Sequence, residues 1–190
     1  MKNKSLYSCL AFILFVGLFS CKKPPVEPEP TGPVMPPLTH EGLNTFGCYI
    51  DGELFVANDG ESVWAIPPVS GGFDENTGDF IIQGTRYRHG ILPDGDASDD
   101  VRIFVEEITN TGKYNYKFLE DGTLGYGNLY EENVCDYYYF DIPNLGEITI
   151  TYLDQEENII AGTFYMTLTN QDCEYSKTMK ITDGRFDYRY

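Results

Sequence analysis

Short runs of strand-forming residues with a period of two, separated by turn residues, most constrain what this 190-residue chain can fold into. The clearest unit is the run 45–50, then Asp51-Gly52, then the run 53–57. Asp-Gly between two such runs is the strongest short-range hairpin signal, because both central residues of a type I′ turn need a positive φ. No apolar spacing of three and four is long enough for a helix above one or two turns. The sequence therefore predicts an all-β fold that begins with a hairpin.

Later segments repeat the same pattern, and turn residues such as Asp183-Gly184 recur between them. The segments are 80–84, 101–105, 114–118, 137–140, 147–152, 159–166 and 178–181. Neighbours in sequence are therefore expected to pair as antiparallel neighbours, with a long loop around 67–78. About ten such strands need to close or to fold into two layers, because a single open sheet exposes its apolar face and its edges. We expect an antiparallel meander that forms either a flattened barrel or a β-sandwich.

The N-terminus has the order of an export signal. Residues 1–20 contain two early lysines and an apolar run that is too short to span a bilayer. The run ends in Leu18-Phe19-Ser20-Cys21, which resembles the lipobox of bacterial lipoproteins. We therefore expect residues 1–20 to be a cleaved signal peptide and Cys21 to carry the lipid. The expected location is the bacterial cell envelope at the outer membrane, on its periplasmic or its surface face, with the lipid bilayer as partner.

A proline-rich stretch follows the lipid-accepting cysteine. Seven of the eleven prolines lie in residues 22–39. Because proline fixes φ and has no N–H to donate, we expect an extended, unpacked tether over 21–43. Its stretch 22–39 reaches roughly 55 Å if fully polyproline-like. The remainder, 44–190, has the length of one domain.

Charge and motif content narrow the function. The formal net charge of −17 repels phosphate backbones, so nucleic acid is not expected as a partner. The two histidines, His40 and His89, have no zinc spacing, and neither a G-x-S-x-G motif nor a phosphate-binding loop is present. We therefore expect no enzyme activity and no cofactor, with a carboxylate-pair glycosidase as the remaining enzymatic alternative.

Three cysteines remain in the domain. Cys135 and Cys173 lie in polar, loop-like stretches, whereas Cys48 lies inside a strand-like run. Disulfides persist in the envelope, so we favour a Cys135–Cys173 bridge, which would stabilise by roughly 4 kcal/mol. The alternative pairs Cys48 with Cys173. With the first pairing, Cys48 is expected to be a small core residue.

The acidic run 94–100 is the one candidate for a metal site. Its alternating oxygens, on Asp94, Asp96 and Asp99, suit Ca²⁺. The EF-hand pattern fails, however, because Asp99 stands where glycine is required and Val105 where glutamate is required. We therefore interpret the run as a solvated acidic loop without a metal.

Aromatic side chains provide a candidate ligand site. The run 137–140 places aromatics on both faces of one strand, and only one face of a sheet normally packs inward. Tyr137 and Tyr139 could therefore join Trp64 in a platform that stacks on sugars. The alternative is that both faces are covered, one of them by the loop around 67–78.

Several segments resemble an uncharacterised family of lipoproteins from Bacteroidetes. They are 46–52 (FGCYIDG), 153–154 with 160–164 (IAGTF), and 181–187 (ITDGRFD). The similarity runs from about Asn44 to Tyr190, and DGRFD is its most specific part. The family usually has serine where this chain has Ala161. The resemblance implies lineage and lipidation, but no catalytic or binding residue.

Within the DGRFD segment, Gly184 fits a turn position that needs a positive φ. Arg185 lies between Asp183 and Asp187, which predicts a structural ion pair rather than a ligand clamp.

These observations favour a membrane-anchored, non-enzymatic binding protein whose ligand is a glycan, a peptide or an apolar molecule. The alternative is a structural or accessory subunit that packs on another envelope protein through an acidic, tyrosine-bearing surface. An open cavity would favour the first function and a flat, exposed aromatic patch the second.

Overall fold

A computed structural model describes residues 32–59, 67–92, 95–116, 124–128, 137–139, 146–170 and 177–190. The predicted signal peptide and Cys21 lie outside these ranges. The described residues contain strands and no helix, so none of them forms a helix that could cross a bilayer. The prediction of an all-β fold is confirmed. The strands are β1 Thr45–Ile50, β2 Glu53–Val56, β3 Val69–Asp74, β4 Asp79–Leu92, β5 Gly95–Val105, β6 Gly112–Tyr114, β7 Leu124–Asn128, β8 Tyr137–Tyr139, β9 Gly146–Asp154, β10 Ile159–Asn170 and β11 Lys177–Arg189.

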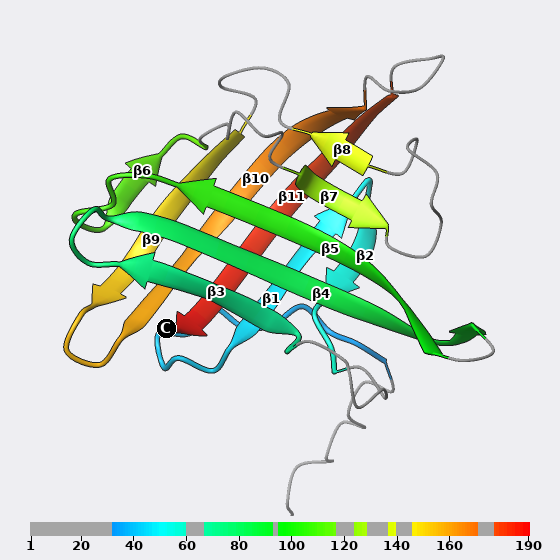
Figure 1. The fold of residues 1–190 in the computed structure, drawn as a ribbon, viewed down its shortest axis with the longest axis horizontal. Helices are drawn as coiled ribbons and strands as arrows, with labels where there is room; N and C mark the ends of the chain where they lie inside the picture. The colour runs from blue at the N-terminus through cyan, green and yellow to red at the C-terminus, as the bar shows by residue number, and fades with distance from the viewer. Residues whose placement is uncertain are drawn as a thin grey trace, which may run out of the picture. The chain divides into compact units, whose positions relative to one another are not determined.

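The strands form two layers that cross each other (Figure 1). Nine of them follow one hydrogen-bonded path, β2-β1-β11-β10-β8-β7-β5-β4-β3, while β9 pairs with β10 and β6 with β9. Strands β2, β1, β11, β10, β9 and β6 make one layer, and β3, β4 and β5 make the other. Along β10, the segment 159–166 pairs with β9 and only Thr169 pairs with β8. Because the path ends at β2 and β3 among the described residues, the expected flattened barrel is not closed, and the arrangement is sandwich-like.

The predicted hairpin joins β1 to β2. Asp51 and Gly52 have φ values of 48° and 88°, which are the left-handed conformations that a type I′ turn requires. The turn is also tied to β11, because the Asp51 N–H donates to the Lys180 carbonyl at 2.8 Å and the Lys180 N–H donates to Asp51 Oδ1 at 2.9 Å. The local signal and the tertiary contacts therefore agree at this position.

The hydrophobic core lies between the two layers. Phe46 of β1 is fully buried, and its ring lies 5.1 Å from that of Phe164 in β10. On the other layer it packs over Gly84 of β4, where a Cβ atom would lie 2.3 Å from the ring. Phe80 of β4 packs on Phe186 of β11 in the same way, with ring centroids 5.5 Å apart. Such contacts hold the layers together, since burying a large apolar side chain contributes about 1.5–3 kcal/mol.

The expected loop around 67–78 contains strand β3, so that prediction is wrong. Its residues Ser70, Gly71 and Gly72 have low strand propensity, which hides the strand from a sequence pattern. Gly71 belongs there because β3 lies very close to β4: a Cβ atom at this position would be 2.2 Å from the Ile81 carbonyl oxygen. The Tyr188 hydroxyl also donates to the Gly71 carbonyl, at 2.9 Å.

Asp183-Gly184 is not a turn between strands, as expected, but lies inside β11. The register of β11 against β10 shifts here by one residue, which marks a β-bulge. The positive φ, 51°, belongs to Asp183 and not to Gly184. Gly184 is required for another reason, because a Cβ atom there would lie 2.4 Å from the Phe164 ring.

The C-terminal part of the expected tether is packed rather than extended into solvent. The structure groups Pro33–Tyr190 as one unit. Residues 36–44, called the strap below, hydrogen-bond to β11: the Thr39 hydroxyl and the Gly42 N–H donate to the Asp187 carboxylate at 2.6 and 2.8 Å. These residues therefore pack on β11, because a buried acceptor there satisfies backbone N–H groups that the sequence pattern was expected to leave in water.

Candidate functional site

A groove of about 480 Å³ lies on the outer face of β9, β10 and β11, away from the second layer. Its residues come from these three strands and from the strap. They are Leu38, Glu147, Thr149, Thr163, Phe164, Tyr165, Thr182, Asp183, Gly184 and Arg185.

Strand register places the floor residues. Thr163 of β10 lies opposite Thr149 of β9 on one side and opposite Arg185 of β11 on the other. Adjacent strands are about 4.8 Å apart, so two hydroxyls and one guanidinium form a row across the sheet. Gly184 and Phe164 also line the groove, but the Phe164 ring points to the inner face of the sheet, where it packs on Phe46 between the layers. The floor therefore offers hydrogen-bond donors and acceptors.

The two walls differ in character. One wall carries Tyr165, whose side chain is 53% exposed, and Glu147, which lies opposite it in register. Glu147 pairs with Lys113 at 2.8 Å, and the hydrogen bond and charge of Glu147 raise the pKa of Lys113. The other wall is Leu38 of the strap. The groove therefore combines an exposed aromatic ring with hydroxyls and charged groups.

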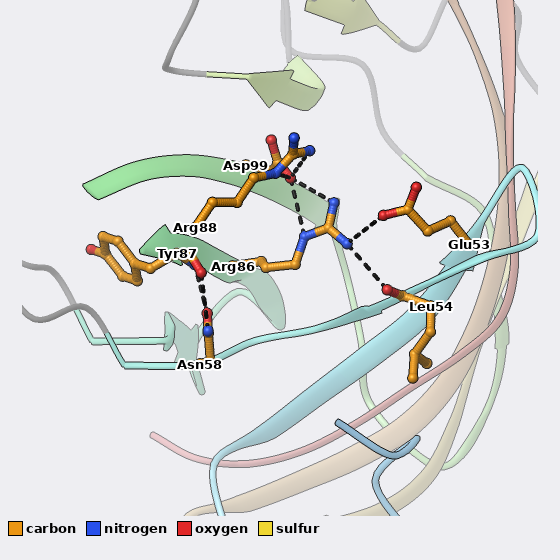
Figure 2. Close-up of polar contacts among 7 residues, drawn as sticks. All are labelled: Glu53, Leu54, Asn58, Arg86, Tyr87, Arg88 and Asp99. Atoms are coloured by element: carbon orange, nitrogen blue, oxygen red, sulfur yellow. Dashed lines mark hydrogen bonds and ion pairs between the residues drawn. The ribbon is translucent and has the colours of Figure 1, made fainter. Parts of the chain in front are cut away.

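A second polar cluster lies between the layers (Figure 2). Arg86 and Arg88 of β4 both bind Asp99 of β5, which is opposite Arg86 in register. Both nitrogens on one side of Arg86 donate to Asp99 Oδ2, at 3.1 and 2.6 Å, and Arg88 Nε donates to the same oxygen at 2.9 Å. The Asp99 side chain is only 1% exposed. Two guanidinium groups thus balance one buried carboxylate.

Arg86 also crosses to the other layer. It donates to the Leu54 carbonyl at 3.1 Å and to Glu53 at 3.0 Å, both in β2, and its guanidinium lies 5.1 Å from the centre of the Phe55 ring. These contacts connect the first strand of the path to β4 on the other layer. We interpret the cluster as a structural bridge across the open side of the sandwich.

Asn58 extends this bridge. Its side chain accepts a hydrogen bond from the Tyr87 N–H at 2.5 Å and donates to the Tyr87 carbonyl at 3.0 Å (Figure 2). The Asn58 N–H also donates to the Thr85 carbonyl at 3.1 Å. Asn58, which follows β2, therefore provides hydrogen-bond partners for backbone groups of β4 at the residues that β3 does not reach.

The acidic run is not the solvated loop that we expected. From Gly95 onward it belongs to β5, and Asp99 and Asp100 are buried on opposite faces. Burial raises the pKa of Asp100, against a hydrogen bond from the Thr85 hydroxyl at 2.8 Å that lowers it. Asp99 is buried because its ion pairs with Arg86 and Arg88 replace the water that an exposed carboxylate would bind. The side chains of Asp94 and Asp96 lie outside the described residues, within which no group of three or more His, Cys, Asp or Glu side chains could hold a metal ion.

Cys48 is a buried, free thiol in the part of the chain that the structure describes. Burial raises its pKa, and the charge of Arg86 lowers it only in part. The prediction of a small core residue is confirmed, and the alternative Cys48–Cys173 pairing is not formed. Cys135 and Cys173 lie outside the described residues, so their pairing stays a prediction.

The predicted aromatic platform is described only in its backbone. Tyr137 and Tyr139 lie in β8, which pairs with β7 and β10, but their side chains and Trp64 lie outside the described residues. Arg185 forms no ion pair with Asp183 or Asp187 among the described contacts. Its guanidinium donates instead to the Pro36 carbonyl at 3.2 Å, because the strap occupies Asp187.

Sequence reasoning did not find the groove. The alternation of threonines with buried isoleucines in β9 was visible, but it indicates only a polar outer face. Bringing Thr149, Thr163 and Arg185 into one row required the pairing of three strands.

Comparison with protein-family models, with curated proteins and with solved structures finds no match. The resemblance to the Bacteroidetes lipoprotein family therefore stays a prediction, and a function has to be argued from the residues.

Proposed function

We propose that this chain is a lipid-anchored envelope protein that binds a glycan, without catalysis, in the groove across β9, β10 and β11. The observation that carries this proposal is the exposed ring of Tyr165 beside the row of Thr149, Thr163 and Arg185. A sugar presents apolar C–H faces and many hydroxyls. An aromatic ring suits the first, while threonine hydroxyls, which donate and accept, suit the second.

The residues that line the groove favour a glycan over an apolar molecule or a peptide. A purely apolar molecule would leave the hydroxyls and charged groups of the floor without partners, which costs free energy for each group desolvated. Extended peptides commonly bind by adding a strand to a sheet edge. The groove lies instead on the face of three paired strands, where the backbone groups of β10 are already used.

Tyr165→Ala is expected to weaken glycan binding about tenfold, because an exposed aromatic contact of this kind contributes roughly 1–2 kcal/mol. Isothermal titration with neutral oligosaccharides and with uronic acid oligosaccharides provides the measurement. Tyr165→Phe keeps the ring and should bind within about threefold of the wild type.

Ile81→Ala is the control, since Ile81 is also exposed, at 42%, but lies on the other layer. If an oligosaccharide binds Tyr165→Ala as tightly as it binds the wild type, the groove is not the binding site. If no oligosaccharide binds the wild type, the proposed function is wrong.

The anchor is tested separately. Intact-mass measurement of the protein purified from membranes of its native host should show a diacylglycerol-sized addition that Cys21→Ala lacks. We expect this because two or more acyl chains hold a protein stably on a bilayer. A wild-type protein that is recovered soluble and unmodified would contradict the anchored interpretation.

The second candidate, an accessory subunit of an envelope complex, is favoured by a different surface. The outer face of β3, β4 and β5 has a shallow hollow of about 600 Å³, where Ile81 and Phe104 lie beside Gly72 with acidic residues at the rim. If this face docks on another envelope protein, the complex of the two should be recovered on purification of the wild type. Ile81→Ala should then release the protein from that complex, whereas Tyr165→Ala should not.

A further inference from the structure

One carboxylate on β11 holds most of the strap. Asp187 is 1% exposed, and both of its oxygens accept hydrogen bonds from the strap. Oδ2 accepts from the Thr39 hydroxyl at 2.6 Å and from the Glu41 N–H at 3.0 Å, and Oδ1 accepts from the Gly42 N–H at 2.8 Å. Burial would raise the pKa of Asp187, but these hydrogen bonds outweigh it and the pKa is lowered. The carboxylate is therefore ionised and fully used by the strap.

Alternate residues of β11 continue this contact along the strap. Arg185, two residues before Asp187, donates to the Pro36 carbonyl at 3.2 Å. Two residues after it, the Arg189 guanidinium donates to the Glu41 carbonyl at 3.4 Å. Because side chains at every second position share a face, β11 presents an Arg-x-Asp-x-Arg row that binds the strap from one end to the other. This role accounts for Arg185, Asp187 and Arg189 of the DGRFDYR segment.

The strap packs closely on the residues beneath it. Pro36 is buried, and a Cβ atom on Gly47 beneath it would lie 2.6 Å from the proline ring. Gly42 has a φ of 67°, a conformation that favours glycine, and a Cβ atom there would be 3.0 Å from the Arg189 side chain. Further along, the His40 ring stacks on Tyr152 of β9 with centroids 4.9 Å apart.

The strap has two connections. Its N-terminal side continues into the stretch that we expect to be tethered to the membrane at Cys21. In the docked position its Leu38 is a wall of the groove, and its Pro36 carbonyl holds Arg185, which is part of the floor. The same nine residues thus lie between the predicted anchor and the candidate ligand site.

We infer that Asp187 is a positioning residue of the groove: it fixes the strap, so that docking of the membrane tether and binding of ligand favour each other. The ligand part rests on the proposed function. A ligand that contacts Leu38 or Arg185 binds the docked state better, and linkage then requires that the bound ligand hold the strap more firmly by the same factor. A strap displaced from β11 opens one wall of the groove and frees Arg185, and ligand affinity falls.

The test compares Asp187→Asn with the wild type in the acylated full chain held in detergent. Hydrogen exchange is read at the amides of Glu41 and Gly42 and, as an internal reference, in β10. In Asp187→Asn the two strap amides should exchange roughly tenfold to a hundredfold faster, the ratio that corresponds to losing one charge-assisted hydrogen bond. The β10 amides should stay within about threefold of the wild type, which shows that the fold is intact.

Asp79→Asn is the matched control, because it makes the same chemical change at a partly exposed position of the other layer. The affinity for the oligosaccharide that binds the wild type is measured on the same samples, and it should fall at least about fivefold in Asp187→Asn and stay unchanged in Asp79→Asn.

Each result decides one part of the inference. Unchanged exchange of the strap amides in Asp187→Asn would overturn the positioning role. Faster strap exchange with unchanged affinity would overturn the coupling and leave glycan binding in place. If no oligosaccharide binds the wild type, the proposed function fails and the coupling to a glycan fails with it, while the exchange data still decide whether Asp187 holds the strap.

Discussion

Arg86→Ala should lower the free energy of unfolding by about 3 kcal/mol, the lower end of the range for breaking a buried ion pair. The variant removes two hydrogen bonds to the buried Asp99 and the contacts with Glu53 and Leu54 on the other layer. The loss stays near the lower end because Arg88 still balances the Asp99 charge. Urea unfolding provides the measurement, with the wild-type slope retained if the native state is otherwise intact.

Glu53→Gln is the control for this prediction. The Glu53 side chain is 76% exposed, so its ion pair with Arg86 should contribute less than about 1 kcal/mol. If Arg86→Ala unfolds at the same urea concentration as the wild type, the cluster is not the bridge between the layers that Figure 2 indicates.

Phe46→Ala should lower the free energy of unfolding by about 3–5 kcal/mol, the usual loss for a buried phenylalanine. Its ring contacts Phe164 and Phe55 within its own layer, and Gly84 on the other layer has no side chain to fill the space left behind. Ile81→Ala, at a half-exposed position of β4, should change stability by less than about 1 kcal/mol. Thermal and urea unfolding measure both variants.

The contact between Phe46 and Gly84 allows a sharper test. Gly84→Ala alone should also destabilise, because the added methyl overlaps the ring. The double variant Phe46→Leu with Gly84→Ala should lose less stability than the sum of the losses of the two single variants, since the smaller side chain leaves room for the methyl group. Strict additivity would mean that the two residues are not in contact.

The aromatic core and the Arg86 cluster together explain how an open sheet keeps its layers together. Aromatic residues of β1, β10 and β11 fill the space between the layers, while Arg86 closes the side where β2 and β4 share no strand pairing. Polar bonds are specific in direction, whereas apolar packing is not, so the cluster helps to select the crossing of the layers that Figure 1 shows.

Local signals in the sequence determined the all-β class, the Asp51-Gly52 hairpin and the burial of Cys48, because each depends on neighbouring residues and on a period of two. The alternation of isoleucine with threonine in β9 indicates one buried and one polar face for the same reason, and Ile148 and Ile150 are buried. The signal peptide, the lipidation of Cys21 and the Cys135–Cys173 bridge remain predictions from the sequence.

Only the tertiary structure decided the rest. β3 exists because Gly71, which has little strand propensity, fits closely against β4. The acidic run becomes a buried strand because two arginines on β4 balance Asp99. The strap docks because Asp187, far away in sequence, accepts its backbone N–H groups, and the groove needs three strands in register. In each case the deciding partner is distant in sequence, and a buried charge or backbone group has a free energy that depends on that partner and not on its neighbours along the chain.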